Sequence, residues 1–331
     1  MISDNEKIDI VMPWVDGSDP EWLKEKRNYK PDTSEDGVRF RDWEVLKYWF
    51  RGIEKYADWV NKVHFITWGH IPSWLNTDNP KLNIVNHKDY IPAEYLPTFS
   101  SHTIELNMHR IDGLADRFVY FNDDIFLCSK TSKEDFFKNG LPCDMAVLFP
   151  NHVNGTNNQF DHILLNNAEY FARHFNIKEV IKKDRSKWLN LKYGKSLIKT
   201  MVLMLFPDFP GIMMHHQPVS FNKSTLERVW EKDGELLDAT CRHRFREATD
   251  INQFVFRYDQ LGRGEFSPYN VFKRGDYLTI GNGVDYSKVL NSGYKIICLN
   301  DTDTTVDFDT EKKRLIAAFE AKFKEKSSFE I

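Results

Sequence analysis

The sequence predicts an α/β fold whose mostly parallel, Rossmann-like sheet is flanked by helices and carries a helical insertion. From residue 8 to residue 127, short apolar segments alternate with segments of helical periodicity. This order is typical of parallel sheets with right-handed crossovers. Within the segment 117–127, residues 118–121 and 125–127 are apolar without alternation. That pattern indicates a strand buried on both faces.

The first strand and helix are predicted near the N-terminus. Residues 8–15 form a short apolar segment that is typical of a strand. Asp19 is followed by Pro20 and an acidic residue. A capping side chain, a proline at the first helical position and an acid in the first turn together indicate a helix start. Asp16 therefore lies on a strand-to-helix loop.

Further strands and helices alternate downstream. Apolar residues repeat at helical spacing from Asp42 onward, and residues 63–67 and 82–85 have the composition of strands. Residues 100–114 predict a second helix, which leads directly into the strand at 117–127.

The rest of the chain divides into an insertion and a closing segment. We expect an α/β core over 1–150, a mainly helical insertion over 151–212, and completion of the core with a C-terminal helix over 213–331. Within the insertion, residues 178–199 carry eight Lys or Arg against two acids, a net charge of +6. This stretch is either a solvated helical face or a landing surface for an anionic partner. The apolar stripe at 311–326 predicts packing against the parent domain, with membrane-surface contact as the alternative.

Bulk properties exclude several classes of protein. A chain of 331 residues with 41% hydrophobic residues can bury a sizeable core. Its net charge of −4 argues against a general polyanion binder, and we expect no nucleic-acid partner. Neither a signal peptide nor an apolar stretch of about 20 residues is visible, so we expect a cytoplasmic protein. The four cysteines show no metal-ligand spacing, and reduced thiols are expected.

Asp123 and Asp124 are the strongest candidates for chemistry. They follow the apolar run that begins at Phe118, at the edge where open α/β sheets bind ligands. Adjacent carboxylates repel each other unless a cation or a polar network holds them. Such oxygen ligands suit Mg²⁺ or Mn²⁺. The alternative is a solvated turn or a helix cap.

Two further groups of polar residues are candidates. On a helix starting near Ser101, His102, Glu105, His109 and Asp112 would share about one quadrant. Histidine accepts protons near neutral pH, whereas a zinc set built from these residues lacks a partner motif.

Arg39, Arg41 and Arg51 form the second group, around the predicted helix start. Guanidinium groups match phosphate geometry, although each arginine could instead form a surface ion pair.

These residues resemble a known family. Residues 8–19 (IDIVMPWVDGSD) resemble the first conserved region of the Stealth proteins, which are sugar-1-phosphate transferases of bacterial capsule synthesis. They are relatives of the animal lysosomal-enzyme N-acetylglucosamine-1-phosphotransferase. The other three regions are matched by RFRD at 39–42, LPTFSS at 96–101, NDD at 122–124, HQP at 216–218 with Arg246 and Asp250, and CLND at 298–301. The first region has Met12-Pro13 where Tyr-Thr is common, and residues 151–210 match nothing in the family.

The resemblance implies a glycosyltransferase-A-like core and transfer of a hexose-1-phosphate from a nucleotide-diphosphate sugar to a glycan hydroxyl. Nucleoside monophosphate would be released, and phosphodiester-linked capsular polysaccharide would form. We expect UDP-N-acetylhexosamine as donor, a growing glycan as acceptor, and Mg²⁺ or Mn²⁺ as cofactor. Peripheral contact with the cytoplasmic face of the inner membrane, or with capsule assembly proteins, is a further expectation.

Roles follow for individual residues. The predicted catalytic residues are His216 as first choice for general base, His102 as second, Asp16 and Arg246. The predicted donor-binding residues are Asp16, Gly17, Arg39, Asp42, Arg51, Asn122 and Asn300. The predicted metal ligands are Asp123, Asp124 and Asp301. The predicted acceptor-binding residues are Lys182, Lys183, Arg185 and Lys187.

Two other functions stay open on the sequence. A metal-dependent glycosyltransferase would attack the anomeric carbon and release nucleoside diphosphate. A glycan-binding module without catalysis would have no need of adjacent carboxylates.

Overall fold

The central sheet is mostly parallel, as predicted. A computed structural model describes residues 7–31, 40–152, 159–301 and 306–331. Five strands follow the order β3-β2-β1-β4-β8, and every neighbouring pair is parallel except β4–β8. These strands are β1 (Ile8–Pro13), β2 (Val63–Thr67), β3 (Leu82–Asn86), β4 (Arg117–Tyr120) and β8 (Val219–Asn222). The strands predicted at 8–15, 63–67 and 82–85 are confirmed.

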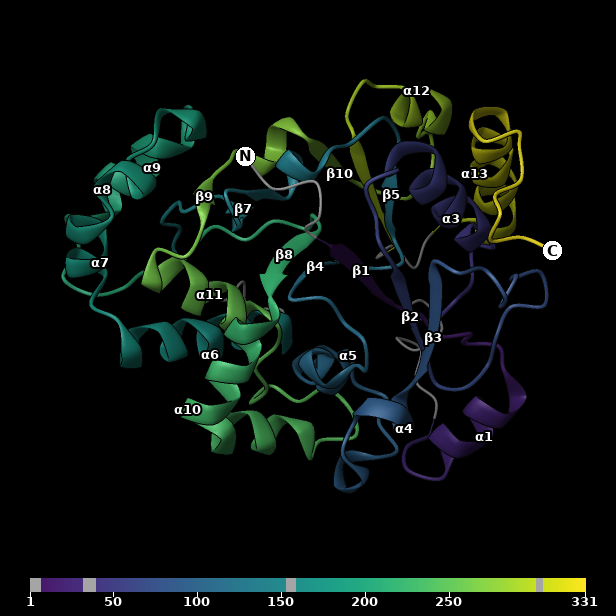
Figure 1. Cartoon of the computed structure of the whole chain (residues 1–331), viewed down its shortest axis with the longest axis horizontal. Helices are drawn as coiled ribbons and strands as arrows, with labels where there is room; N and C mark the ends of the chain where they lie inside the picture. The colour runs from purple at the N-terminus through teal and green to yellow at the C-terminus, as the bar shows by residue number, and fades with distance from the viewer. Residues whose placement is uncertain (1–6, 32–39, 153–158, 302–305) are drawn as a thin grey trace.

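Two three-stranded sheets lie beside the central one (Figure 1). The first has the order β10-β11-β5, in which β11 is antiparallel to β5. The second has the order β6-β7-β9. Their strands are β5 (Ile125–Leu127), β10 (Gly275–Thr279), β11 (Ile296–Asn300), β6 (Phe137–Lys138), β7 (Leu141–Asp144) and β9 (Ser267–Pro268).

The single strand predicted over 117–127 is wrong. The chain forms β4 up to Tyr120, turns, and continues as β5 in a different sheet. The polar residues at 122–124 cannot extend a strand whose two faces are both buried in apolar clusters. The backbone N–H of Ile125 instead donates to the carbonyl of Asn122 at 3.3 Å, which closes the turn.

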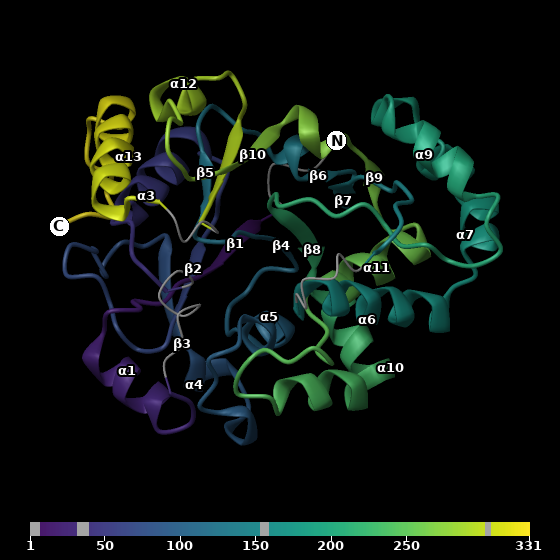
Figure 2. The ribbon, with the colours of Figure 1, turned by 180° about the vertical axis from the view of Figure 1, so that it is seen from behind.

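Helices cover the sheets from two sides. The helices are α1 (Pro20–Arg27), α3 (Leu46–Tyr56), α4 (His87–Tyr90), α5 (Ser101–Leu106), α6 (Gln159–His174), α7 (Ile177–Lys183), α8 (Arg185–Trp188), α9 (Ser196–Leu203), α10 (Lys223–Cys241), α11 (Phe254–Arg263), α12 (Tyr286–Leu290) and α13 (Phe308–Lys322). Figures 1 and 2 show α3 and α13 together at one end and α6, α10 and α11 at the other. With strands alternating with helices, the predicted α/β class is confirmed.

The two faces of β1 divide the core. Ile8, Ile10 and Met12 belong to one buried cluster with residues of α3 and α13, whereas Val11 belongs to a second cluster with residues of α5, α10 and α11. Side chains of a strand alternate between faces, so a strand with apolar residues on both must be covered on both.

Local signals account for α1 and for the early end of α5. The Asp19 side chain accepts hydrogen bonds from the backbone N–H groups of Glu21 and Trp22, which confirms the predicted helix start. The helix predicted over 100–114 ends at Leu106, because the Asn107 side chain donates to the carbonyl of Thr103 at 2.9 Å and a short 3-10 turn follows.

The segment 151–212 and the C-terminal helix pack in different core clusters, the first with α11 and the second with α3. Helices α6–α9 lie within 151–212, and Phe171 and Ile181 pack in the same cluster as Tyr258 of α11. In α13, Phe319 is buried and its ring stacks on Tyr48 at a centroid distance of 5.2 Å, so the predicted packing against the parent domain is confirmed. None of the described helices is both long and apolar enough to cross a bilayer.

A buried ion pair ties β7 to α11. Asp144 accepts from Nε of Arg257 at 2.7 Å and from a terminal guanidinium nitrogen at 3.0 Å, and the Arg257 side chain is fully buried. The same guanidinium donates to the carbonyls of Met213 and Met145, both at 3.1 Å. Burial alone would raise the pKa of Asp144, but Arg257 and His215 outweigh it and hold that pKa below its usual value.

Breaking this pair should be costly. We expect Asp144→Asn to lower the free energy of unfolding by about 3–5 kcal/mol, because the Arg257 charge stays buried without its carboxylate. Glu169→Gln is the matched control, since Glu169 pairs with Arg173 on the exposed face of α6 and should cost less than about 1 kcal/mol. Urea unfolding of both variants measures the difference, and equal midpoints would contradict the prediction.

Candidate functional site

A cavity of about 1360 Å³ lies at the carboxyl edge of the central sheet. Its walls come from the ends of β1, β4 and β11, the segment before β8, and the first turns of α5 and α6. Parallel strands end at the same edge, so loops that are distant in sequence meet there. The predicted residues that line the cavity are Asp42, His102, Asn122, Asp123, Asp124, His216, Arg246, Asn300 and Asp301.

The antiparallel pairing of β4 and β8 brings His216 to the turn after β4. Tyr120 pairs with Val219 in the β4–β8 register. Asn122 is two residues beyond Tyr120, and His216 is three residues before Val219. The side-chain amide nitrogen of Asn122 lies 2.9 Å from Nε2 of His216. The same Nε2 is 3.5 Å from Oδ2 of Asp124. An aspartate and a histidine about ninety positions apart in sequence therefore share one wall.

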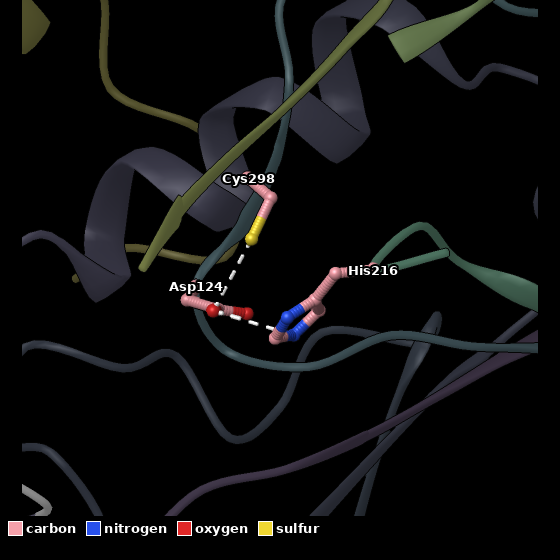
Figure 3. A group of neighbouring side chains, drawn as sticks. All are labelled: Asp124, His216 and Cys298. Atoms are coloured by element: carbon pink, nitrogen blue, oxygen red, sulfur yellow. Dashed lines mark hydrogen bonds and ion pairs between the residues drawn. The ribbon is translucent and has the colours of Figure 1, made fainter. Parts of the chain in front are cut away.

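The pairing of β5 and β11 brings Cys298 to the other side of Asp124. Cys298 pairs with Ile125, and its thiol donates to Oδ2 of Asp124 at 3.3 Å. Figure 3 shows Asp124 between Cys298 and His216. One ligand atom from each of these three residues lies within 4.8 Å of the others. Burial and the Asp124 carboxylate raise the pKa of the Cys298 thiol far above its usual value, so this thiol stays protonated and donates.

Asp123 and Asp124 fit a divalent cation. Oδ1 of Asp124 is buried and has no hydrogen-bond partner. Asp123 is exposed to the cavity, but the protein around it still reduces its solvation. This loss of solvation, and then the charge of Asp124, raise the pKa of Asp123 to about 7. A buried oxygen without a partner beside a second carboxylate is an arrangement that a bound cation would satisfy.

His216 and His102 differ in their surroundings. The His216 side chain is 34% exposed; burial lowers its pKa, but the hydrogen bond and charge of Asp124 outweigh burial and raise that pKa above its usual value. His102 is 2% exposed, and its Nδ1 lies 2.9 Å from Oδ2 of the buried Asp250. His216 is therefore the more accessible of the two to a substrate in the cavity.

Three predicted residues face the cavity as donors or charges. A terminal nitrogen of Arg246 donates to the hydroxyl of Ser101 at 2.6 Å, which places its positive charge beside the first turn of α5. Asp42 also lines the cavity, and burial raises its pKa. The Asn300 amide donates to the hydroxyl of Tyr277.

Asp301 lines the cavity but is engaged by the protein. Arg41 forms a two-pronged ion pair with its carboxylate, and Nε1 of Trp43 donates to Oδ2 at 2.8 Å. A carboxylate whose oxygens accept three such hydrogen bonds has little capacity left for a cation. This geometry corrects the metal role predicted for Asp301 and places Arg41 at the end of β11.

Asp16, Gly17 and Arg51 are not among the residues lining the cavity. Asp16 directly follows Val15, which does line the cavity. Its Oδ1 accepts hydrogen bonds from the backbone N–H and the hydroxyl of Ser18. A Cβ on Gly17 would sit 2.0 Å from the carbonyl oxygen of Phe40, so close backbone approach explains this glycine. Arg51 pairs with Glu330 at 2.6 Å and donates to the carbonyl of Phe323, which corrects its predicted donor role.

The remaining predicted residues lie elsewhere. Lys182, Lys183 and Arg185 are exposed on α7 and α8, and none lines the cavity. Nζ of Lys187 donates to the carbonyl of Gly264, so this residue holds two segments together. Arg39 lies outside the described residues. Of the predicted histidine stripe, His102 and Glu105 reach the cavity, whereas His109 packs beside Trp230 and Asp112 is exposed.

Cys298, Gln253 and Tyr277 were not predicted as site residues. Cys298 stood in the matched CLND motif, but its proximity to Asp124 depends on strand pairing that the sequence does not display. Tyr277 places its ring 5.6 Å from that of His216, and Gln253 lines the cavity with a buried oxygen that lacks a partner.

Comparison with known proteins assigns the family. The family models "Stealth protein CR1, conserved region 1" and "Stealth protein CR2, conserved region 2" match residues 6–34 and 39–144. The chain is 41% identical to the capsular polysaccharide phosphotransferase WcwK of Streptococcus pneumoniae, with 98% of each chain covered. The chain belongs to the Stealth family. Asp123 and Asp124 fall within the second conserved region of this Stealth protein.

Other relatives are similar over the same length. The Stealth chain is 38% identical to the exopolysaccharide phosphotransferase cps2G of Lactiplantibacillus plantarum (98% and 96% covered) and to the receptor polysaccharide phosphotransferase WefC of Streptococcus gordonii (98% and 99% covered). Among solved structures, it is similar to the galactosyltransferase LgtC in complex with donor and acceptor sugar analogs, with a TM-score of 0.42, 10% identity and 95% of each chain covered.

The cavity carboxylates should bind a cation without substrate. With Mn²⁺ at a hundredfold excess over its Kd, we expect the melting temperature to rise by about 4 °C, because the ion binds only the folded state. Asp124→Asn should abolish this rise, whereas Asp112→Asn, on an exposed turn, should retain it. Without metal, Asp123→Asn should be at least as stable as the wild type, because one of two repelling charges is removed. An unchanged shift in Asp124→Asn would contradict the assignment.

Proposed function

We propose that this Stealth protein is a transferase that moves a hexose-1-phosphate from a nucleotide-diphosphate sugar to a hydroxyl of a growing capsular glycan. The observation that carries the proposal is the meeting of Asp123, Asp124 and His216 in one cavity of a chain that is similar over its whole length to polysaccharide phosphotransferases. We expect UDP-N-acetylhexosamine as the donor.

The proposed reaction is an in-line displacement at phosphorus. The oxygen of the acceptor hydroxyl attacks the phosphorus next to the sugar and forms a new P–O bond. The bond from that phosphorus to the oxygen bridging the two phosphoryl groups breaks, and its electron pair leaves with the nucleoside monophosphate. The hydroxyl proton passes to a base. Such transfers depend on positioning and on fixed positive charge.

The chain's own residues can be assigned to these needs. Asp123 and Asp124 would hold Mg²⁺ or Mn²⁺, which when bound neutralises charge on the diphosphate. Arg246 supplies a guanidinium on the cavity wall for the transferring phosphoryl group. Asp42, Asn122 and Asn300 offer hydrogen bonds to the donor, with Asp16 at the rim.

His216 is the proposed base, with His102 as second choice. A base must reach the hydroxyl, and His216 is the more exposed of the two histidines on this wall. The Asp250 carboxylate contacts Nδ1 of His102, a contact that would orient the His102 ring.

The proposed acceptor surface is electrostatic. Lys182, Lys183 and Arg185 lie outside the cavity, so they could only attract a long acceptor from a distance. A phosphodiester-linked glycan carries one negative charge per link. Peripheral contact with the inner membrane or with capsule assembly proteins belongs to the same proposal.

The leaving group tests the reaction. With its proper donor and Mg²⁺, the protein should release nucleoside monophosphate, and the product should show a phosphodiester signal in ³¹P NMR. Release of nucleoside diphosphate, with no phosphorus in the product, would identify a glycosyltransferase instead. Binding without turnover would identify a glycan-binding module.

The base can be tested by substitution. His216→Ala should lower kcat by about 10²–10⁴, because proton removal from the acceptor is lost, while donor binding stays near normal. His102→Ala is the paired variant, and a loss confined to it would exchange the two roles. If neither substitution affects turnover, an aspartate such as Asp16 becomes the candidate.

The acceptor surface predicts a dependence on chain length. Charge reversal of Lys182, Lys183 and Arg185 to Glu should raise the KM for long acceptors at low salt, because it turns attraction into repulsion. The effect should shrink at physiological ionic strength, where the Debye length is only about 8 Å. Short acceptors and the donor should be nearly unaffected. Equal effects on long and short acceptors would leave a solvated helical face as the explanation.

A further inference from the structure

The outer face of α9 and its flanking turns is apolar and exposed. Twelve large apolar side chains are exposed in the described part of the chain, and half of them lie between residues 191 and 206. Leu191 is 86% exposed, Leu205 83% and Ile198 61%. We call this set the α9 patch; its members are Leu191, Ile198, Met201, Val202, Leu205 and Phe206. Isolated exposed apolar residues are ordinary, but a contiguous group marks an interaction surface.

Helix α9 is apolar on its outer face as well as on its inner face, where Leu203 and the following Met204 pack against the core. Its buried position, Thr200, is polar, and the Thr200 hydroxyl accepts from the backbone N–H of Leu148 at 3.1 Å. At 100° per residue, Ile198 and Val202 point to the side opposite Thr200, and Met201 lies at about a right angle to it. A surface helix that packs only on its own domain normally has polar residues on its outer face. The hydrogen bond of Thr200 fixes this orientation, so the apolar side cannot roll inward without leaving a buried donor unpaired.

Positive charge borders the apolar face. Lys195 and Lys199 are exposed and lie on one flank of the same helical turns, beside Val202. Lys192 is exposed at the start of the patch, but its Nζ donates to the carbonyl of Pro268 at 3.0 Å. The stretch 178–199 has a net charge of +6 in a chain whose overall charge is −4. An apolar face beside lysines matches the two layers of an anionic lipid surface, which are acyl chains and negatively charged headgroups.

The patch also lies where a flat partner could reach it. Figure 1 shows α7, α8 and α9 along one edge of the molecule, at the far side from α1, and Figure 2 shows the same separation from behind. An edge that projects from the body can touch a planar surface without the rest of the molecule intervening.

We infer that the α9 patch docks on an anionic lipid bilayer, with its apolar side chains entering the interface and Lys195 and Lys199 contacting the headgroups. The inference extends the membrane contact proposed above and gives that contact a surface. It is independent of the donor chemistry, because lipid binding needs no nucleotide sugar. If the vesicle experiment fails, the proposed transfer reaction is unaffected, and if the transfer reaction is wrong, the lipid-docking inference is unaffected.

The test is sedimentation of the full chain with vesicles. The protein should sediment with vesicles of phosphatidylcholine containing phosphatidylglycerol, and much less with phosphatidylcholine alone. The triple variant Ile198→Ser, Val202→Ser, Leu205→Ser should lower the partition coefficient at least about tenfold. Ile71→Ser, an exposed apolar position outside the patch, should leave it unchanged.

Charge has its own arm. Lys195→Gln with Lys199→Gln should lower partitioning by about fivefold per lysine, and high salt should mimic the change. The matched control is Lys24→Gln with Lys88→Gln, two exposed lysines on α1 and α4. Circular dichroism and thermal unfolding establish that each variant is folded.

A labelled cysteine reports insertion directly. The four native cysteines are buried, so a dye on Leu205→Cys reports one site, and its emission should shift to the blue with anionic vesicles. A dye on Ile71→Cys should not shift. Vesicle binding that is unchanged in the serine triple variant would overturn the inference. A second result would also overturn the inference: a wild-type protein that is dimeric, a triple variant that is monomeric, and no vesicle binding by either. The partner of the patch would then be a second copy of the chain.

Discussion

One passage of the chain between two sheets governs the site. After Tyr120 the backbone leaves the central sheet, turns through residues 122–124, and enters the smaller sheet at Ile125. The strand before the turn pairs with β8 and the strand after it pairs with β11. Each pairing carries one distant side chain, His216 or Cys298, to the same carboxylate. The two adjacent carboxylates are tolerated in this turn because they face a cavity rather than the apolar clusters on either side.

A second set of contacts holds the histidine segment in place. The guanidinium of Arg257 binds the carbonyl of Met213, and Nε2 of His215 lies 3.3 Å from the Asp144 carboxylate. Met213 and His215, two of the three residues just before His216, are thus held by a buried charge pair, so that stability and site geometry depend on the same interactions. Buried ion pairs are often neutral for stability compared with apolar packing, and positioning is one reason for a protein to keep one.

Much of the fold followed from local signals, whereas the site depended on distant ones. The strand at 63–67 and the Asp19 helix start were predictable because apolar composition and capping act within a few residues. The predicted strand over 117–127 failed because a run of apolar residues does not reveal that it divides between two sheets. Asp123 and Asp124 were identifiable from their position after a strand, but the Arg41–Asp301 pair joins residues 260 positions apart, and no local pattern shows it.

The segment that carries α7, α8 and α9, predicted as an insertion over 151–212, is flanked by residues that lie side by side in the fold. Leu148 and Ile212 form an antiparallel β-bridge. Outside this bridge, the Asp144 carboxylate contacts Nε2 of His215, the residue next to His216. A loop whose two ends are fastened together changes its closure cost by only about 0.6 kcal/mol for each doubling of its length. Its inner side must still cover the core around Tyr258, but its outer side can diverge freely. Such an arrangement permits modular exchange, in which one chemical centre is combined with different outer arms without a change in strand register.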